Sequence, residues 1–150
     1  MVQIFEASGK DALTARINQL TTASQAQWGK MNVSQMLAHC NVAFELIYDN
    51  KHPKPGKIKQ FMLKLFVKPI VVGNKPYQKN GRTAPEFIIN SEKEFDKEKK
   101  RLLDYIDKTH ELGASHFEDK DSNSFGKLSS NEWNNMLVKH LDHHLKQFGS

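Results

Sequence analysis

Two histidines near the end of the sequence, His140 and His144, lie four residues apart in an otherwise apolar helical pattern. Side chains at positions i and i+4 of a helix are about 5–6 Å apart at Cβ, so both imidazoles could reach one metal ion. The alternative is a pair of core histidines that are satisfied by ordinary hydrogen bonds. We favour a metal or catalytic role, because an unpaired buried polar group costs about 1–3 kcal/mol and each histidine would need its own partner.

A third ligand is expected on a neighbouring helix, since catalytic metal sites commonly take three protein ligands and leave one position open. His39 is the best candidate, because it lies mid-helix at the edge of an apolar face. Helical bundles build metal sites from inward side chains on facing helices. The sequence therefore predicts a site made by His39, His140 and His144, although His39 alone would more often be a packed core residue. The remaining histidines are weaker candidates, of which His143 could line the mouth of such a site: His52, His110, His116 and His143.

The histidine pair belongs to a helix predicted over residues 129–148. Ser129 and Glu132 fit a capping box at its start, and Gly149 fits its end. Its apolar face recurs at spacings of three and four and comprises Trp133, Leu137, Leu141 and Phe148 with the two histidines. The residues predicted to face the opposite, solvent side are Asn135, Lys139, Asp142 and Lys146.

The rest of the chain predicts further helices with irregular connections. A first helix opens at Ser8 and Asp11, and a second, with a capping box at Asn32 and Gln35, ends near Asn50. The polar residues expected opposite the apolar face of the second helix are Ser34, Asn41, Glu45 and Asp49. The remaining predicted elements are a helix over 57–67 ended by Pro69, an irregular connection over 71–90, a helix capped by Ser91 and Glu94 that stops near Gly113, and a polar loop over 114–127. Only 86–89 offers a strand pattern, so we expect an all-α bundle of four main helices with one long crossover and a short extra helix.

Composition favours a single domain over residues 1–150 in a reducing, cytoplasmic setting. Cys40, the only cysteine, excludes an internal disulfide, and we expect it in the core. The beginning of the sequence lacks a signal peptide, and the apolar run over 61–72 is too short and too charged to span a bilayer. Nine Lys or Arg and no acidic residue lie between 51 and 85. We expect a solvated basic surface there, with neither nucleic acid nor membrane as partner, because no recognition motif accompanies the charge.

Two segments, WGKMNVSQMLAHC (28–40) and FGKLSSNEWNNMLVKHLDHHLKQFG (125–149), carry a resemblance to a known group. They resemble a branch of the DinB superfamily whose function is unknown. The resemblance implies a DinB-like four-helix bundle, often a homodimer, with a three-histidine site for a divalent metal such as zinc or nickel. One ligand comes from the second helix and an HxxxH pair from the last, which in this sequence are His39, His140 and His144. The sequence departs from the branch at Ser122 and Asn123, where a histidine and a proline are expected.

The expected chemistry follows from a metal with one open position. Such a metal acts as a Lewis acid, and it could lower the pKa of a bound water towards ~7 or bind a thiol as thiolate. Characterised relatives of the resembled superfamily include thiol S-transferases and isomerases that use bacillithiol, mycothiol or glutathione. We therefore expect a metal-dependent thiol transferase or a hydrolase acting on a small molecule, with Lys75, Lys79 and Arg82 available to attract an anionic thiol. The alternative is a non-catalytic helical bundle that binds a small molecule or a protein partner.

Overall fold

The computed structural model describes residues 1–49 and 51–150, and most of these residues are helical. Asn50, near which we expected a helix to end, lies outside the described residues. The elements in chain order are α1 (Ala7–Gln19), α2 (Val33–Tyr48), α3 (Lys57–Phe66), α4 (Lys68–Val72), the 3₁₀ turn η1 (Pro85–Phe87), α5 (Phe95–Phe117), β1 (Lys120–Ser122), β2 (Gly126–Leu128) and α6 (Ser130–Gln147).

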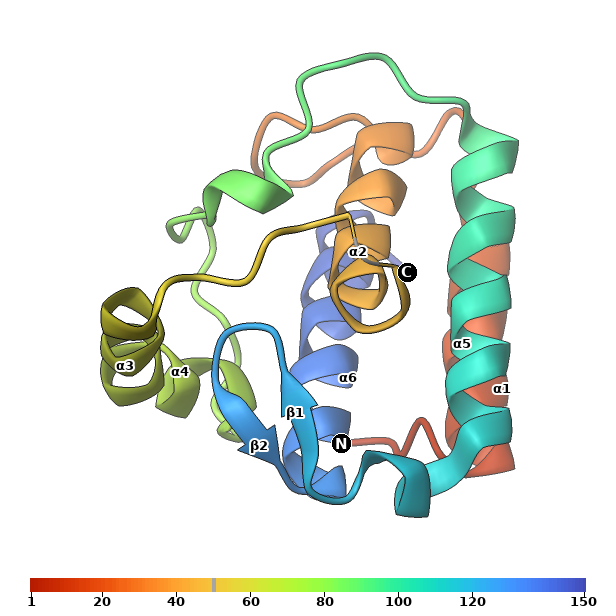
Figure 1. Cartoon of the computed structure of the whole chain (residues 1–150). Helices are drawn as coiled ribbons and strands as arrows, with labels where there is room; N and C mark the ends of the chain where they lie inside the picture. The colour runs from red at the N-terminus through yellow and green to blue at the C-terminus, as the bar shows by residue number, and fades with distance from the viewer. Residues whose placement is uncertain (50) are drawn as a thin grey trace.

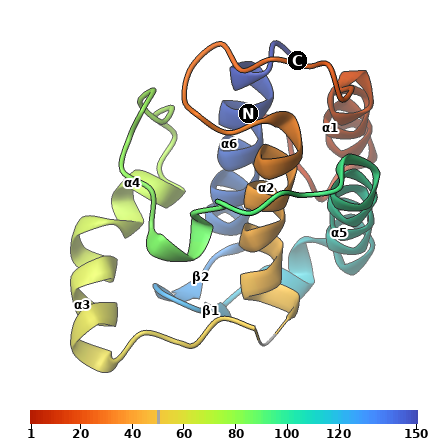
Figure 2. The same cartoon turned by 90° about the horizontal axis from the view of Figure 1, so that it is seen from above.

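The four longest helices, α1, α2, α5 and α6, share one apolar core. Figures 1 and 2 show α2 beside α6, with α1 and α5 paired on one side and α3 and α4 on the other. The core is built from buried side chains of all four helices, among them Leu13, Ile17, Leu37, Phe44, Leu102, Ile106, Leu137 and Leu141. The predicted helical class and the long crossover between α4 and α5 are confirmed. A four-helix bundle of the DinB-like type stays a prediction.

Local sequence signals fix the two helices that carry the candidate ligands. Asn32 accepts a hydrogen bond from the Gln35 N–H at 2.8 Å, and the Gln35 side chain accepts one from the Asn32 N–H at 3.0 Å. Ser129 and Glu132 form the same reciprocal box at the start of α6. These two predicted capping boxes are confirmed, and each satisfies backbone donors that a helix start leaves free.

Other predicted boundaries are wrong. Ser8 lies inside α1, whose N-cap residue is Glu6. The N-cap of α5 is Glu94, which makes no side-chain capping bond, so the box predicted with Ser91 is absent. The helix predicted over 57–67 is confirmed as α3, which ends at Phe66. Pro69 then lies in the first turn of α4, a short helix that was not predicted, because a proline there lacks only an N–H that the helix would leave unpaired.

Most of the loop predicted over 114–127 is in fact helix or strand. Gly113 interrupts α5 at φ +70°, near the predicted stop, but one more turn follows to Phe117. An antiparallel hairpin then pairs Lys120 with Leu128 and Ser122 with Gly126, which corrects the purely α prediction. The hairpin belongs to a second apolar cluster made by Phe117, Phe125, Leu128 and Trp133. The predicted strand over 86–89 is wrong, because η1 occupies its first half and no strand follows there.

The two residues that depart from the family resemblance, Ser122 and Asn123, lie in the hairpin, where Ser122 bonds within the hairpin and Asn123 bonds to the segment before α3. Ser122 is buried, and its hydroxyl donates to the Gly126 carbonyl at 2.8 Å and accepts from the Phe125 N–H at 2.9 Å. The Asn123 amide donates to the His52 carbonyl at 3.3 Å. Ser122, which stands where a histidine was expected, therefore stabilises the turn between β1 and β2.

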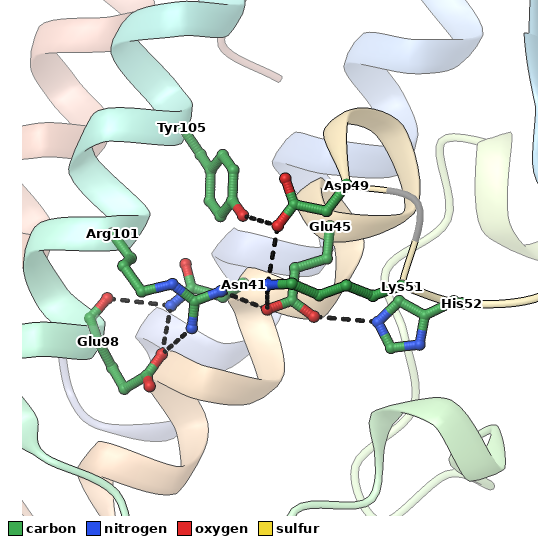
Figure 3. A network of polar contacts seen from close by, with 8 residues as sticks. All are labelled: Asn41, Glu45, Asp49, Lys51, His52, Glu98, Arg101 and Tyr105. Carbon is green, nitrogen blue, oxygen red and sulfur yellow. Dashed lines mark hydrogen bonds and ion pairs between the residues drawn. The ribbon is translucent and has the colours of Figure 1, made fainter.

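A buried polar network joins α2 to α5 (Figure 3). Asn41, predicted to face solvent, is 0% exposed and donates to the backbone carbonyl and the carboxylate of Glu98 at 3.0 and 2.8 Å. Arg101 lies between Glu98 and Glu45 and binds both carboxylates. Burial opposes the charge of Arg101, but the hydrogen bonds with Glu45 and Tyr105 and the charges of Glu98 and Glu45 together outweigh it and raise the pKa of Arg101. Because residues 39 and 41 lie about 200° apart around a helix, this network turns His39 towards α6.

Candidate metal centre

The structure brings the three predicted histidines together between α2 and α6. Ring nitrogens from His39, His140 and His144 all lie within 4.8 Å of one another, and the three could hold a metal ion. The Nε2 atoms of His39 and His140 are 2.9 Å apart. His39 and His144 are 5% and 7% exposed, and the His144 ring lies 4.4 Å from the ring of His39 between centroids.

The backbone of η1 orients His39. Its Nδ1 lies 2.8 Å from the carbonyl oxygen of Phe87. A carbonyl only accepts hydrogen bonds, so Nδ1 carries the hydrogen and the lone pair of Nε2 points into the cluster. The ring of Phe87 also packs on His39 and His140 at centroid distances of 5.3 and 5.5 Å. The long crossover loop therefore supplies both an orienting acceptor and an apolar cover.

Gln147 orients His144 in the same way. Its Nε2 donates to the carbonyl of Trp28, which fixes the direction of the amide. Its Oε1 is then the atom that lies 2.8 Å from Nδ1 of His144, so Nδ1 donates and the Nε2 lone pair is free. The two sequence segments that carry the family resemblance thus meet here, because Trp28 lies in the first and Gln147 in the second.

The loop before α2 approaches Gln147 closely at Gly29. Gly29 has φ +83°, and a Cβ at this position would lie 2.6 Å from the Gln147 Nε2. The Gln147 carbonyl also accepts a hydrogen bond from the Gln27 N–H at 2.8 Å. A residue with a side chain at position 29 would therefore displace the amide that orients His144.

The donor set fits a divalent metal. With the hydrogen of His39 on Nδ1, the short contact between Nε2 atoms requires His140 to donate from its own Nε2 in the neutral cluster. Two imidazole nitrogens on one tetrahedral zinc lie about 3.3 Å apart, given Zn–N bonds of about 2.0–2.1 Å. The observed 2.9 Å therefore needs an opening of only a few tenths of an ångström (~0.4 Å). His39 and His144 already hold the tautomer that a metal requires.

The surroundings keep the imidazoles uncharged. Burial lowers the pKa of His39, and burial with the neighbouring histidines lowers the pKa of His140 well below its usual value. Burial chiefly, with the charge of His39, lowers the pKa of His144 to about 3. Neutral imidazole is the form that binds metal, so the site is prepared for a cation at neutral pH.

A cavity of about 150 Å³ lies beside the cluster, with Trp28, Tyr77, Lys79, His143 and Lys146 among the residues that line it. His143 lies between it and the histidine cluster, since its ring lies 5.0 Å from that of His144 and 5.7 Å from that of Trp28. Burial lowers the pKa of His143 and raises that of Tyr77 to about 12. The prediction that His143 could line a mouth fits this position.

The other histidines lie in separate environments. His52 contacts Glu45 at 3.0 Å, His110 contacts the Phe5 carbonyl at 3.0 Å, and His116 contacts Lys120 at 3.1 Å. His116 belongs to α5 rather than to a loop. Cys40 is buried in the core as predicted, and burial raises the pKa of its thiol. Among the basic residues expected to attract an anion, Lys79 lines the cavity, whereas Lys75 and Arg82 are exposed and do not line it.

One side of α6 was predicted wrongly. Asn135 and Lys139 are 8% and 3% exposed, although the pattern placed them in solvent. The Lys139 ammonium donates to the carbonyls of Ile70 and Gly73, and the Asn135 amide donates to the Val72 carbonyl at 3.0 Å. These bonds satisfy the carbonyls at the end of α4 and tie α4 to the helix that carries His140 and His144.

Sequence reasoning also missed two residues that orient the ligands. Phe87 acts through a backbone carbonyl, which any residue type could supply, so its identity carries no signal. Gln147 could have been found, because it follows His144 by three residues and so lies on the same side of α6. Second partners of metal-bound histidines are commonly carbonyl or carboxylate oxygens, and both residues offer such an oxygen.

Fold and site together define a mostly helical protein with a three-histidine cluster that could hold a metal ion. The chain belongs to the family described as protein of unknown function DUF1569, whose model matches residues 5–150. No curated protein and no solved structure matches the chain. Within the described residues, every helix is too short or too polar to cross a membrane.

Proposed function

We propose that this protein binds one divalent metal ion, zinc or nickel, through His39, His140 and His144, and acts on a small molecule there. The observation that carries the proposal is the pair of acceptors, the Phe87 carbonyl and Gln147 Oε1, each 2.8 Å from an Nδ1. These acceptors place the hydrogens of His39 and His144 on Nδ1, so that the Nε2 of each is free to bind a metal, and the Nε2 of His39 lies 2.9 Å from that of His140. A histidine packed in a core needs hydrogen-bond partners, but packing alone does not require the ring nitrogens of three histidines to lie within 4.8 Å of one another.

Each ligand then has a distinct part. His39 and His144 are held in place by their acceptors. His140 would have to change tautomer, with its hydrogen exchanged through water from Nε2 to Nδ1, for its Nε2 to bind a cation. When bound, a metal with three protein ligands supplies Lewis acidity at one further position. Phe87 covers the cluster and limits access of bulk water. Three lysines, Lys79, Lys139 and Lys146, outnumber the single acidic residue, Asp142, in the lining of the neighbouring cavity and give it a positive character. This character favours a substrate or cosubstrate with a negative charge.

The resemblance to the DinB superfamily supports a more specific proposal. If the family is a branch of that superfamily, the reaction is a transfer to a low-molecular-weight thiol such as bacillithiol or glutathione, or a hydrolysis. A thiol transferase consumes one thiol for each electrophile converted. A hydrolase converts its substrate without any thiol, so the two activities are separated by omitting the thiol from the assay.

Metal content tests the proposal first. The protein would be purified without chelator or immobilised nickel and analysed by plasma mass spectrometry beside His140→Ala. The matched control is His116→Ala, which removes an exposed histidine from α5. We expect about one metal ion per chain in the native protein and the control, and loss of that metal in His140→Ala. A native protein that holds no metal and takes up neither Zn²⁺ nor Ni²⁺ would overturn the proposal.

One observation favours a second candidate, a non-catalytic bundle that binds a small molecule or a partner. The cavity of about 150 Å³ is lined by His143 and by none of the three clustered histidines. A ligand in this cavity could therefore bind without touching a metal. Binding of a small anion that is equal in native protein and His140→Ala would support this alternative.

A further inference from the structure

Helix α3 presents apolar side chains to solvent. Within the described structure, six of the nine exposed large apolar residues belong to α3 and α4: Ile58, Phe61, Met62, Leu65, Phe66 and Ile70. We call these six residues the α3–α4 face. No residue of α3 is buried, and Ile58 is 85% exposed. Exposed apolar side chains gathered on two neighbouring helices in this way usually mark a binding surface.

The helix has two apolar sides with different roles. Leu63 and Val67 pack against the second core cluster and hold α3 on the protein. At 100° per residue, Ile58, Met62 and Leu65 lie on the opposite side, directed away from that cluster. Figures 1 and 2 both show α3 at the outer edge of the molecule, on the side away from α1 and α5. The core therefore does not account for the outward apolar side.

Lysines border the outward apolar side of α3. By the same helical geometry, Lys57 and Lys64 lie along one border and Lys59 lies along the other. All three are exposed. A solvated basic helix would instead turn its lysines to the centre of the outer side and its apolar residues inwards. The lysines of α3 are solvated as predicted, but they border an outward apolar side that the prediction did not include.

The α3–α4 face is fixed to the body of the protein. Lys68 pairs with Glu132 of α6 at 2.8 Å, and Gln60 donates to the Asn123 carbonyl at 3.4 Å. Lys139 and Asn135 hold the end of α4 as described above. The face is thus presented in one orientation, as a docking surface requires.

Charge identifies the occupant. Residues 51–85 contain nine Lys or Arg and no acidic residue. A second copy of this face would bring lysines against lysines, with no carboxylate in the segment to pair with them. An anionic lipid surface matches both features, because the apolar residues enter the acyl boundary and the bordering lysines contact lipid phosphates.

We propose that the α3–α4 face binds the surface of an anionic membrane, with α3 lying in the plane of the interface. This departs from our expectation that the protein has no membrane partner. It agrees with the absence of a membrane-crossing helix among the described residues, since an interfacial helix lies on the bilayer rather than spanning it. The proposal does not depend on the metal.

Vesicle sedimentation of the full chain tests the proposal. The probe is phosphatidylcholine vesicles with roughly a quarter phosphatidylglycerol, compared with pure phosphatidylcholine. One variant is Phe61→Ser with Leu65→Ser, and a second is Lys57→Gln with Lys64→Gln. The matched control is Lys97→Gln with Lys127→Gln, which removes two exposed lysines from other elements. All six positions are exposed, so circular dichroism should show unchanged helix content.

We expect binding to anionic vesicles only, a loss of about tenfold or more in the apolar variant, and a loss of several-fold in Lys57→Gln with Lys64→Gln. The control should bind as the native protein does, and added salt should weaken binding. Absence of binding, or equal binding to neutral vesicles, would overturn the proposal. It would also be overturned if ultracentrifugation showed a native dimer that the apolar variant converts to monomer, since the face would then be occupied by a second copy.

Discussion

Gln147 holds His144 in the tautomer that a metal ligand needs, through a contact of 2.8 Å between Oε1 and Nδ1. The Gln147 amide is oriented from outside the cluster, because its Nε2 donates to the Trp28 carbonyl and so leaves Oε1 facing His144. The orientation of a candidate ligand on α6 therefore depends on the loop that precedes α2.

Replacing Gln147 by leucine should weaken metal binding by about tenfold or more, because His144 would lose its orienting acceptor. The measurement is Zn²⁺ affinity by competition with a chromophoric chelator. Gln25→Leu, at an exposed position of the same loop, is the control and should keep native affinity. Equal affinities in the two variants would mean that Gln147 does not orient a ligand.

Gly29→Ala should destabilise the protein by about 1–2 kcal/mol, since an alanine at positive φ is strained. It should also weaken Zn²⁺ binding, because the new Cβ would push on the Gln147 amide, 2.6 Å away. Gly56→Ala is the control, since a Cβ there would meet nothing within 4 Å. Urea denaturation and metal affinity give the two readouts, and an unchanged affinity in Gly29→Ala would contradict the proposed path from the loop to His144.

Acid should destabilise the metal-free protein through the buried imidazoles. The folded pKa of His144 is about 3, below the ordinary value of 6.5, and those of His39 and His140 are also lowered. The unfolded chain takes up protons below pH 6.5 while the folded chain does not. The stability is therefore fully present above about pH 6.5 and is lost as the pH falls towards the folded values, by about 1.4 kcal/mol per pH unit for each histidine. Urea denaturation between about pH 7 and 5 should show a smaller slope in His144→Leu, and an identical slope would refute this account.

Arg101→Met should lower the free energy of unfolding by about 2 kcal/mol, because it leaves the Glu98 carboxylate without its cation and removes one of the partners of Glu45. The value is below that for a fully buried pair, since the Arg101 side chain is 30% exposed. Lys100→Met, which breaks an exposed pair with Asp104, should cost less than about 0.5 kcal/mol. If the two variants were equally stable, the network in Figure 3 would not be what holds α2 on α5.

The sequence allowed prediction of the residues whose position follows from local periodicity. His140 and His144 share a face of α6 because of their spacing, and the capping boxes of α2 and α6 depend only on neighbours. Lys139 and Asn135 could not be predicted as buried, because their partners are carbonyls of α4, more than sixty residues away in the chain. The role of the Phe87 carbonyl could not be predicted for a related reason, since every residue type has the same backbone carbonyl.

The sequence also indicated the basic character of residues 51–85 but not the direction in which α3 presents it. Helical periodicity shows that α3 has two sides, yet Leu63 and Ile58 are equally apolar, and only tertiary packing decides which of them turns inwards. The hairpin at β1 and β2 was missed because three-residue strands are too short to show alternation.

The contact between His39 and His140 joins residues that are 101 positions apart. Bringing two such distant residues together in an unfolded chain costs conformational entropy. A metal that alone held them together would be needed for the fold itself. Here the apolar core of α1, α2, α5 and α6 already closes that span. A metal ion would thus enter a site that is already formed. A chelator should therefore remove the metal and leave the helices folded, whereas a zinc finger unfolds when it loses its metal.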